Sequence, residues 1–161
     1  MSTKFFTNST GNTLFDKFKG IAADMINFDS FLAVVGFFRS SGYFKLRKEL
    51  GNVSEIKILV GINIDDIFRK HNKALLMLAD EDKAKEIYHN GFKEDIVNAQ
   101  YSPEVEEGIL QMCEDLVSGH LQMRIHATKN LHAKFYLCLP QNHSEHSDGW
   151  VIMGSSNISD S

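Results

Sequence analysis

The spacing of apolar residues in the first third of the chain predicts a helix, a strand and a second helix. Over residues 13–28 the apolar positions recur at helical intervals, which indicates an amphipathic helix. The run FLAVVGFF, residues 31–38, is short, continuous and rich in β-branched and aromatic residues, which is typical of a buried strand. Helical spacing resumes over residues 43–50, and Ser40 or Ser41 is available as the N-cap.

The spacing of apolar residues changes twice more along the rest of the chain. EIKILVGI, residues 55–62, predicts a second strand, and a long polar, helical middle extends from residue 65 to about residue 119. Within it, Ser102 precedes a proline and acidic residues, which predicts a helix over residues 103–118. After Gly119 the apolar residues recur at every second position. This pattern predicts three strands, over residues 121–125, 131–139 and 150–153, with a polar loop before the last one.

This order of elements predicts an α/β domain with a mixed β-sheet and helices on both faces. The chain has 161 residues, of which 43% are hydrophobic, so it suffices for one domain with a substantial core but not for two. We therefore expect residues 1–161 to form a single domain. Cys113 and Cys138 stand alone, and we expect both to be reduced core thiols. We expect the aromatic residues near the first strand to pack in the core: Phe31, Phe37, Phe38, Tyr43 and Phe44.

Charge is distributed unevenly along the chain. The formal net charge of −4 argues against binding nucleic acid by bulk electrostatics. However, residues 94–115 include seven acidic residues and no lysine or arginine, whereas residues 116–144 include no acidic residue. Candidate chemistry is therefore expected on the basic side. The first ten residues lack the features of a signal peptide, and no apolar run approaches the roughly 18 residues of a membrane helix, so we expect a cytoplasmic protein without membrane contact.

Polar side chains that could take part in catalysis lie in one of the last two predicted strands and directly after the other. In LHAKFYL, strand alternation puts His132, Lys134 and Tyr136 on one side, and it puts only apolar residues, which we expect to face the core, on the other. WVIMGSSN ends in a glycine, which would let the backbone approach a ligand closely. It continues with hydroxyl and amide groups at the strand's end: Ser155, Ser156 and Asn157.

The pair of motifs HxK and GSSN, about twenty residues apart, resembles the signature of the phospholipase D superfamily. The resemblance covers roughly the last thirty residues and implies a phospholipase D-like fold. It implies that His132 attacks a phosphodiester and forms a covalent phosphohistidine, while Lys134 and Asn157 bind the phosphate oxygens. Ser155 and Ser156 are supporting candidates for substrate binding. No metal or other cofactor is implied.

Two departures from the family pattern have consequences. The family's acidic residue would fall at Leu139, and the nearest downstream acidic residues are Glu145 and Asp148. In addition, the family's active site uses two motifs, whereas this chain has one. We therefore expect a homodimer in which the two copies of His132 face each other across a two-fold axis.

Other basic residues allow two interpretations. Arg124 and Lys129 are either contacts to the substrate backbone or ordinary surface charge. His126 with His132 has no recognised metal-ligand spacing, so we expect no metal site there. We expect structural or solvated roles for the remaining histidines: His71, His89, His120, His143 and His146.

The resemblance does not by itself name a substrate, because the superfamily includes lipases, phospholipid synthases, nucleases and repair enzymes. The chain lacks a hydrophobic anchor and a basic amphipathic helix, which disfavours a lipid enzyme. Small single-motif members are typically dimeric nucleases, and such domains also occur fused to helicase or DNA-binding regions. The first hypothesis is a metal-independent, homodimeric phosphodiesterase that acts on DNA in a restriction, repair or helicase-linked system. The alternatives are a catalytically inactive module for nucleic-acid binding or dimerisation, and a phospholipid hydrolase.

Family domains usually continue with a helix and a strand after GSxN, whereas here four residues follow Asn157. We therefore expect a domain truncated at its C-terminus or excised from a longer DNA-processing protein.

Overall fold

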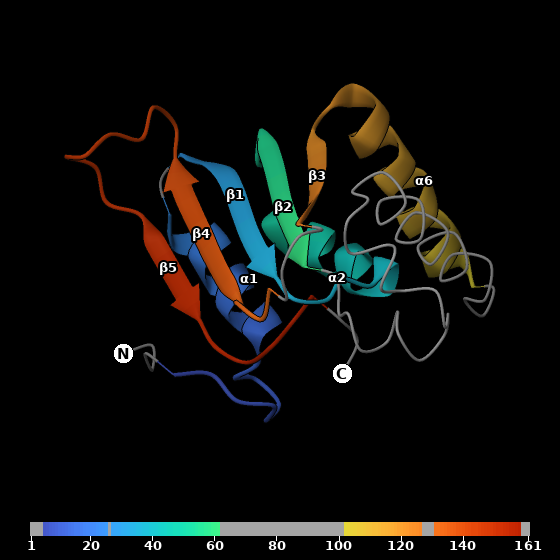
Figure 1. Ribbon diagram of the computed structural model, residues 1–161, viewed down its shortest axis with the longest axis horizontal. Helices are drawn as coiled ribbons and strands as arrows, with labels where there is room; N and C mark the ends of the chain where they lie inside the picture. The colour runs from blue at the N-terminus through green and yellow to red at the C-terminus, as the bar shows by residue number, and fades with distance from the viewer. Residues whose placement is uncertain (1–4, 26, 62–101, 127–130, 159–161) are drawn as a thin grey trace, which may run out of the picture.

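The computed structural model describes residues 5–25, 27–61, 102–126 and 131–158 (Figure 1). They form a five-stranded mixed sheet with three helices, which confirms the predicted α/β class. The elements are α1 (Leu14–Asp24), β1 (Phe28–Val35), α2 (Ser40–Leu50), β2 (Glu55–Gly61), α6 (Pro103–Ser118), β3 (Leu121–His126), β4 (Phe135–Pro140) and β5 (Trp150–Met153). Most of the predicted helical middle lies outside the described residues.

The strand order of the sheet is β3-β2-β1-β4-β5. Strands β1, β2 and β3 are parallel, β4 is antiparallel to β1, and β5 is antiparallel to β4. The carboxyl ends of β1, β2, β3 and β5 therefore lie at one edge of the sheet, together with the amino end of β4. We call this the carboxyl edge. In open α/β sheets, ligands bind at this edge.

One face of the sheet, the inner face, carries the hydrophobic core. Phe18 of α1 packs edge-to-face against Phe31 of β1 and Tyr136 of β4, with ring centroids 5.2 Å apart in both pairs. All three described helices contribute to this one core, and α1 and α2 lie behind the strands in Figure 1. The inward strand residues are Phe31, Ala33, Val35, Ile56, Ile58, Val60, Leu121, Tyr136 and Cys138. Helices were predicted on both faces; the three described ones cover the inner face only.

The ends of α1 and α6 follow from local chemistry. The Thr13 hydroxyl accepts from the Asp16 N–H at 3.2 Å, and the Asp16 carboxylate accepts from the Thr13 N–H at 2.8 Å, so a capping box starts α1. The hydrogen bond from the Thr13 hydroxyl lowers the pKa of Asp16. The predicted helix over residues 13–28 is too long, because Asn27 has φ 58° and Phe28 already pairs with β4. Ser102 caps α6 as predicted, accepting from the Val105 N–H at 3.3 Å.

The start of α2 differs from the prediction. Its N-cap is Arg39, which makes no side-chain capping hydrogen bond, so both serines lie inside the first turn. Strand β1 ends at Val35, three residues before the end of the apolar run. The chain beyond it turns toward the segment after β5, where Phe38 forms an isolated bridge with Ile158. That turn brings the start of α2 to the carboxyl edge.

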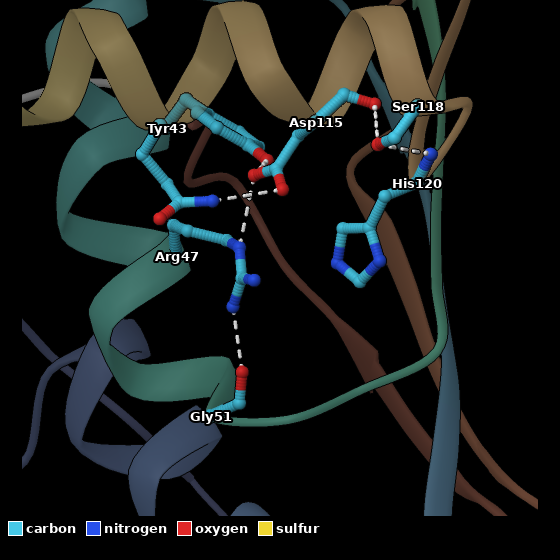
Figure 2. A network of polar contacts seen from close by, with 7 residues as sticks. Tyr43, Arg47, Gly51, Asp115, Ser118 and His120 are labelled. Atoms are coloured by element: carbon cyan, nitrogen blue, oxygen red, sulfur yellow. Dashed lines mark hydrogen bonds and ion pairs between the residues drawn. The ribbon is translucent and has the colours of Figure 1, made fainter.

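A polar network around Asp115 joins α2 to α6 (Figure 2). Its carboxylate accepts from the Tyr43 hydroxyl at 2.6 Å, from Arg47 Nε at 2.9 Å and from Gln111 Nε2 at 3.0 Å. Burial raises the pKa of Asp115, but the hydrogen bonds from Tyr43, Arg47 and Gln111 outweigh it and hold the pKa below its ordinary value. Arg47 also donates to the carbonyl of Gly51 at 2.6 Å. We call Tyr43, Arg47, Gln111 and Asp115, with the carbonyl of Gly51, the Asp115 network.

The predicted core residues are mostly confirmed. Phe31, Phe38, Tyr43 and Phe44 are buried, whereas Phe37 is half-buried beneath the guanidinium of Arg39, which lies 4.6 Å from the ring centroid. Cys138 is buried, and burial raises the pKa of its thiol to about 12. Cys113 is exposed on α6, so the prediction that it is a core thiol is wrong. None of the helices in the described ranges is long and apolar enough to cross a bilayer.

Candidate active site

His132 and Lys134 precede β4 rather than lying within it, because the strand begins at Phe135. The predicted orientation of this strand is wrong: Tyr136 and Cys138 face the core, while Phe135 and Leu137 are only half-buried on the opposite side. Tyr136 can occupy the core because its ring packs against Phe18 and its hydroxyl donates to the Ser156 carbonyl at 2.6 Å. A buried tyrosine with a satisfied hydroxyl behaves as an apolar residue.

Two glycines position the segment before β4. A β carbon built on Gly61 would lie 2.6 Å from the Leu131 carbonyl oxygen, and one built on Gly36 would lie 2.8 Å from the same atom. The chain at Leu131 therefore crosses directly over the ends of β1 and β2, and a side chain at either glycine would displace it. Val60 faces the core, so the next residue of β2, Gly61, faces the other side. The segment thus lies on the face opposite the core, which we call the outer face.

The side chain of Lys134 is held close to the backbone of His132. Its ammonium group donates to the His132 carbonyl at 2.8 Å, and it would lie 3.5 Å from a β carbon on Gly36. An ammonium group has three N–H donors, so this bond leaves donors for a ligand. The lysine is half-buried, while His132 is exposed. The His132 side chain is therefore open to solvent, and the positively charged Lys134 contacts the backbone of the same residue.

Asn157 is fixed at the end of β1. Its Oδ1 accepts from the Phe37 N–H at 3.1 Å, and the next residue, Ile158, accepts from the Arg39 N–H at 3.0 Å through its carbonyl. Since the carbonyl end of the Asn157 amide is engaged by the backbone, the NH₂ end is the part presented to a ligand. The orientation suits binding of a phosphate oxygen, which accepts hydrogen bonds.

The two motifs meet around the end of β1. Gly36 contacts the segment that bears His132 and Lys134, and the next residue, Phe37, holds Asn157. The two motifs are also joined directly, because the Gly154 N–H donates to the Lys134 carbonyl at 3.2 Å. The structure therefore brings the three predicted catalytic residues to the carboxyl edge.

The residues around Asn157 have more structural roles than expected. A β carbon on Gly154 would lie 2.7 Å from the ring of Phe6, so this glycine makes room for an aromatic ring of the same chain rather than for a ligand. The Ser156 carbonyl anchors to Tyr136, and its side chain is half-buried. Ser155 is exposed at the edge. Of the two serines, Ser155 is the more accessible to substrate.

The other predicted residues are more distant or not described. Arg124 is exposed on the outer face of β3, opposite Leu59, two residues before the strand reaches the carboxyl edge. Lys129 lies outside the described residues. Glu145 and Asp148 are exposed in the loop after β4, at the far end of the sheet (Figure 1). Six strand residues, about 20 Å, separate that loop from the site, so neither acid reaches His132 of its own chain.

The histidines of the same loop are exposed, as predicted for His143 and His146. His126 was considered only as a metal ligand, but it lies at the carboxyl edge and pairs with Gly61. The sequence signal for this part of the site was the pair of glycines inside two apolar runs, Gly36 and Gly61, because glycine within such a run marks close backbone approach. Among the described residues, no group of three or more His, Cys, Asp or Glu side chains could hold a metal ion.

Comparison of the chain with models of known protein families gave no match, and comparison with curated proteins gave none either. The resemblance to the phospholipase D superfamily therefore rests on the two motifs and on where their residues lie.

Proposed function

We propose that this chain is a metal-independent phosphodiesterase of the phospholipase D type that cleaves DNA through a phosphohistidine intermediate. One observation carries the proposal: three residues lie together at the carboxyl edge of an α/β sheet. They are the exposed His132, Lys134 with one side-chain hydrogen bond among the described residues, and Asn157 with the carbonyl end of its amide held by the backbone. This set supplies a nucleophile together with donors for the non-bridging oxygens of a phosphodiester. These donors matter because negative charge grows on those oxygens in the transition state.

The proposed reaction has two steps. A neutral ring nitrogen of His132 attacks phosphorus and forms a P–N bond, while the P–O bond to the leaving nucleoside oxygen breaks and a second, protonated histidine donates its proton to that oxygen. Water then attacks phosphorus and breaks the P–N bond, and the same second histidine, now neutral, accepts a proton from the water. Lys134 and Asn157 bind the non-bridging oxygens in both steps.

The second histidine is His132 of another copy, so the proposed enzyme is a homodimer with a two-fold axis at the site. The proposal includes a phospholipase D-like fold, for which helices on both faces of the sheet are expected. It also includes a covalent link, in a longer protein, to a helicase or DNA-binding region.

The charge distribution supports a polyanionic substrate. Among the described residues, the carboxyl edge carries Lys134 and, near it, Arg124, while Glu145 and Asp148, the nearest acidic residues downstream of Lys134, lie at the opposite end of the sheet. Phosphate contacts of this type position a nucleic acid without reading its sequence.

The test is cleavage of labelled single- and double-stranded DNA in excess EDTA. We expect cleavage by the wild-type chain and none by His132→Ala, with full activity in the matched control His143→Ala, whose side chain is exposed in the remote loop. Cleavage that EDTA abolishes would contradict the metal-independent mechanism. Hydrolysis of phospholipid vesicles without DNA cleavage would indicate that the substrate is lipid and not DNA.

A binding module is the second candidate, and one observation favours it: half-buried Leu139 occupies the position of the family's acidic residue. This function predicts salt-dependent DNA binding without turnover. Binding would survive in His132→Ala and weaken in Lys134→Ala, because only the lysine supplies charge to the phosphate.

A further inference from the structure

Residues 37–39 connect the end of β1 to the start of α2 and lie directly beside Asn157. The Phe37 N–H donates to Asn157 Oδ1 at 3.1 Å, and the Arg39 N–H donates to the Ile158 carbonyl at 3.0 Å. An isolated parallel bridge joins the same two segments between these bonds. The backbone of Arg39 is therefore fixed relative to Asn157, which the proposed function assigns to phosphate binding.

The side chain of Arg39 is exposed and lies over an aromatic ring. Its guanidinium carbon is 4.6 Å from the centroid of the half-buried Phe37 ring. Cation–π attraction holds a guanidinium group in such a position and uses none of its five N–H donors. These donors form a planar fork that matches the oxygens of a phosphate group. The Phe37 ring therefore presents a phosphate-binding side chain at the carboxyl edge.

The stability of α2 does not account for an arginine at its start. Arg39 is the N-cap of the helix, makes no side-chain capping hydrogen bond, and is followed by a first turn without an acidic residue. The amino end of a helix carries a partial positive charge, so a cation there is unfavourable by itself, whereas an anion is favourable. An anion bound by Arg39 would offset the charge of the side chain and that of the helix end together.

We propose that Arg39 binds a second phosphate of the DNA strand, next to the phosphate that His132 attacks. This inference rests on the proposed function, because that reaction places the first phosphate against Lys134 and Asn157. Two residues of extended chain span at most about 7 Å, so the backbone nitrogens of Phe37 and Arg39 are no farther apart than this. An arginine side chain that starts so close to Asn157 can reach the neighbouring phosphate of the same strand.

The inference makes the substrate a strand with at least two consecutive phosphates. This requirement distinguishes a nucleic acid from a phospholipid whose only phosphate is the diester itself. A contact to the backbone does not read the bases, so Arg39 would add affinity without sequence preference. Arg39 is then a substrate-binding residue. Phe37 is a positioning residue, because its ring holds the guanidinium group while its N–H holds Asn157.

The first test is the salt dependence of DNA binding, which requires no cleavage. Fluorescence anisotropy of a labelled single-stranded oligonucleotide gives Kd at several salt concentrations. One phosphate contact contributes about 0.7 to the slope of log Kd against log salt concentration for a single strand. We expect Arg39→Ala to raise Kd about tenfold and to lower this slope by about 0.7. Because the side chain is exposed, its removal should leave the fold intact.

The matched control is Lys48→Ala. It also removes one exposed positive charge from α2, but from the last turn of the helix, so Kd and slope should remain those of the wild-type chain. An Arg39→Ala variant with the wild-type Kd and slope would overturn the inference. A wild-type chain that binds no DNA would overturn it as well.

The second test identifies the phosphate that Arg39 binds. The substrates are a trinucleotide with two phosphate linkages and two analogues in which one linkage or the other is a methylphosphonate, which carries no charge. We expect Arg39→Ala to slow cleavage in excess EDTA about tenfold with the normal trinucleotide. With one of the analogues the wild-type chain and the variant should differ by less than about twofold, because the arginine then has no charged partner. An equal loss with all three substrates would contradict a contact to the neighbouring phosphate.

Phe37→Leu tests the positioning role of the ring. The substitution keeps the N–H that holds Asn157 and removes the aromatic face under the guanidinium group. We expect Kd for DNA to rise about threefold in the wild-type background and to remain unchanged in the Arg39→Ala background. An equal rise in both backgrounds would show that Phe37 does not act through Arg39.

Binding and cleavage together separate failure of this inference from failure of the proposed function. Binding that depends on Arg39, in a chain that never cleaves DNA, supports the second phosphate contact and contradicts the proposed reaction. Cleavage by a chain whose DNA binding and cleavage rates do not depend on Arg39 overturns the inference alone. Loss of affinity in Arg39→Ala, with a matching loss of cleavage that one methylphosphonate removes, supports both.

Discussion

Two polar clusters in this molecule use similar side chains for different purposes. In the Asp115 network, Asp115 is 4% exposed, and its carboxylate accepts hydrogen bonds from three side chains of α2 and α6 (Figure 2). At the carboxyl edge, His132 is exposed. Among the described residues, Lys134 makes one side-chain hydrogen bond, and Asn157 is bound at the carbonyl end of its amide. The first cluster satisfies its charges internally; the second leaves donors open.

The difference shows what distinguishes a structural polar cluster from a binding site. A buried polar group destabilises the fold unless its hydrogen bonds are made, and the Asp115 carboxylate makes three that join two helices. Open donors at a sheet edge add no stability of their own, and their value comes from a bound anion. Substitutions in the two clusters should therefore affect different measurements.

The largest effect is expected from His132→Ala. Removing a covalent nucleophile should lower DNA cleavage by about 10⁴-fold or more. Because the side chain is exposed, the free energy of unfolding should change by less than about 0.5 kcal/mol. Single-turnover cleavage and urea unfolding of the same preparation measure both quantities. A large loss of stability would mean that this histidine belongs with the structural cluster.

Asn157→Asp should give the next largest effect. The carboxylate can still accept from the Phe37 N–H, but it replaces the amide donor by a negative charge beside the phosphate. We expect cleavage to fall about 10²- to 10³-fold with little change in melting temperature. Cleavage rates equal to those of the wild-type chain would show that this amide does not contact substrate.

Asp115→Ala should act on stability alone. It leaves the Tyr43 hydroxyl and Arg47 without their acceptor, so we expect the free energy of unfolding to fall by about 2–3 kcal/mol. Denaturant unfolding measures the loss. Below the unfolding transition, cleavage should remain at the wild-type rate, and a selective loss of cleavage would remove the distinction between the clusters.

The same carboxylate should make stability depend on pH. The pKa of Asp115 is lower in the folded chain than its ordinary 3.8, so its contribution is complete above about pH 4 and disappears as the pH falls through the folded value. The difference in unfolding free energy between the wild-type chain and Asp115→Asn should therefore be larger at pH 7 than at about pH 2.5. Equal differences at both pH values would contradict the charged role of Asp115.

Tyr136→Phe should give the smallest effect. It removes the hydroxyl that donates to the Ser156 carbonyl and keeps the ring that packs against Phe18. We expect a loss of about 1 kcal/mol in stability. We also expect a several-fold rise in KM with a smaller change in kcat, because Tyr136 positions the segment that bears Asn157. Steady-state kinetics separates these two parameters, and unchanged kinetics would show that this anchor does not position Asn157.

The sequence predicted those parts of the fold that depend on local chemistry. The start of α6 at Pro103 follows from a serine cap and acidic first-turn residues, and β5 spans the predicted residues. The faces of β4 were not predictable, because alternation alone does not tell which side meets the core. Tyr136 is a polar residue by type, but its hydroxyl donates to the carbonyl of Ser156, twenty residues away.

The site was predictable as residues but not as geometry. HxK and GSSN identified His132, Lys134 and Asn157, while the contacts that position them come from Gly36 and Phe37, about a hundred residues earlier. Such long-range contacts leave no periodic signal. The two glycines inside the apolar runs 31–38 and 55–62 were the one local sign of a close crossing.

The most direct test of the central claim is to trap the covalent intermediate. End-labelled DNA is mixed with excess enzyme in EDTA, the reaction is quenched in alkali, where phosphohistidine persists, and the labelled peptide is sequenced. The account predicts DNA attached to the peptide that contains His132, and no adduct in His132→Ala. DNA cleavage with no adduct, or with an adduct at another residue, would contradict it.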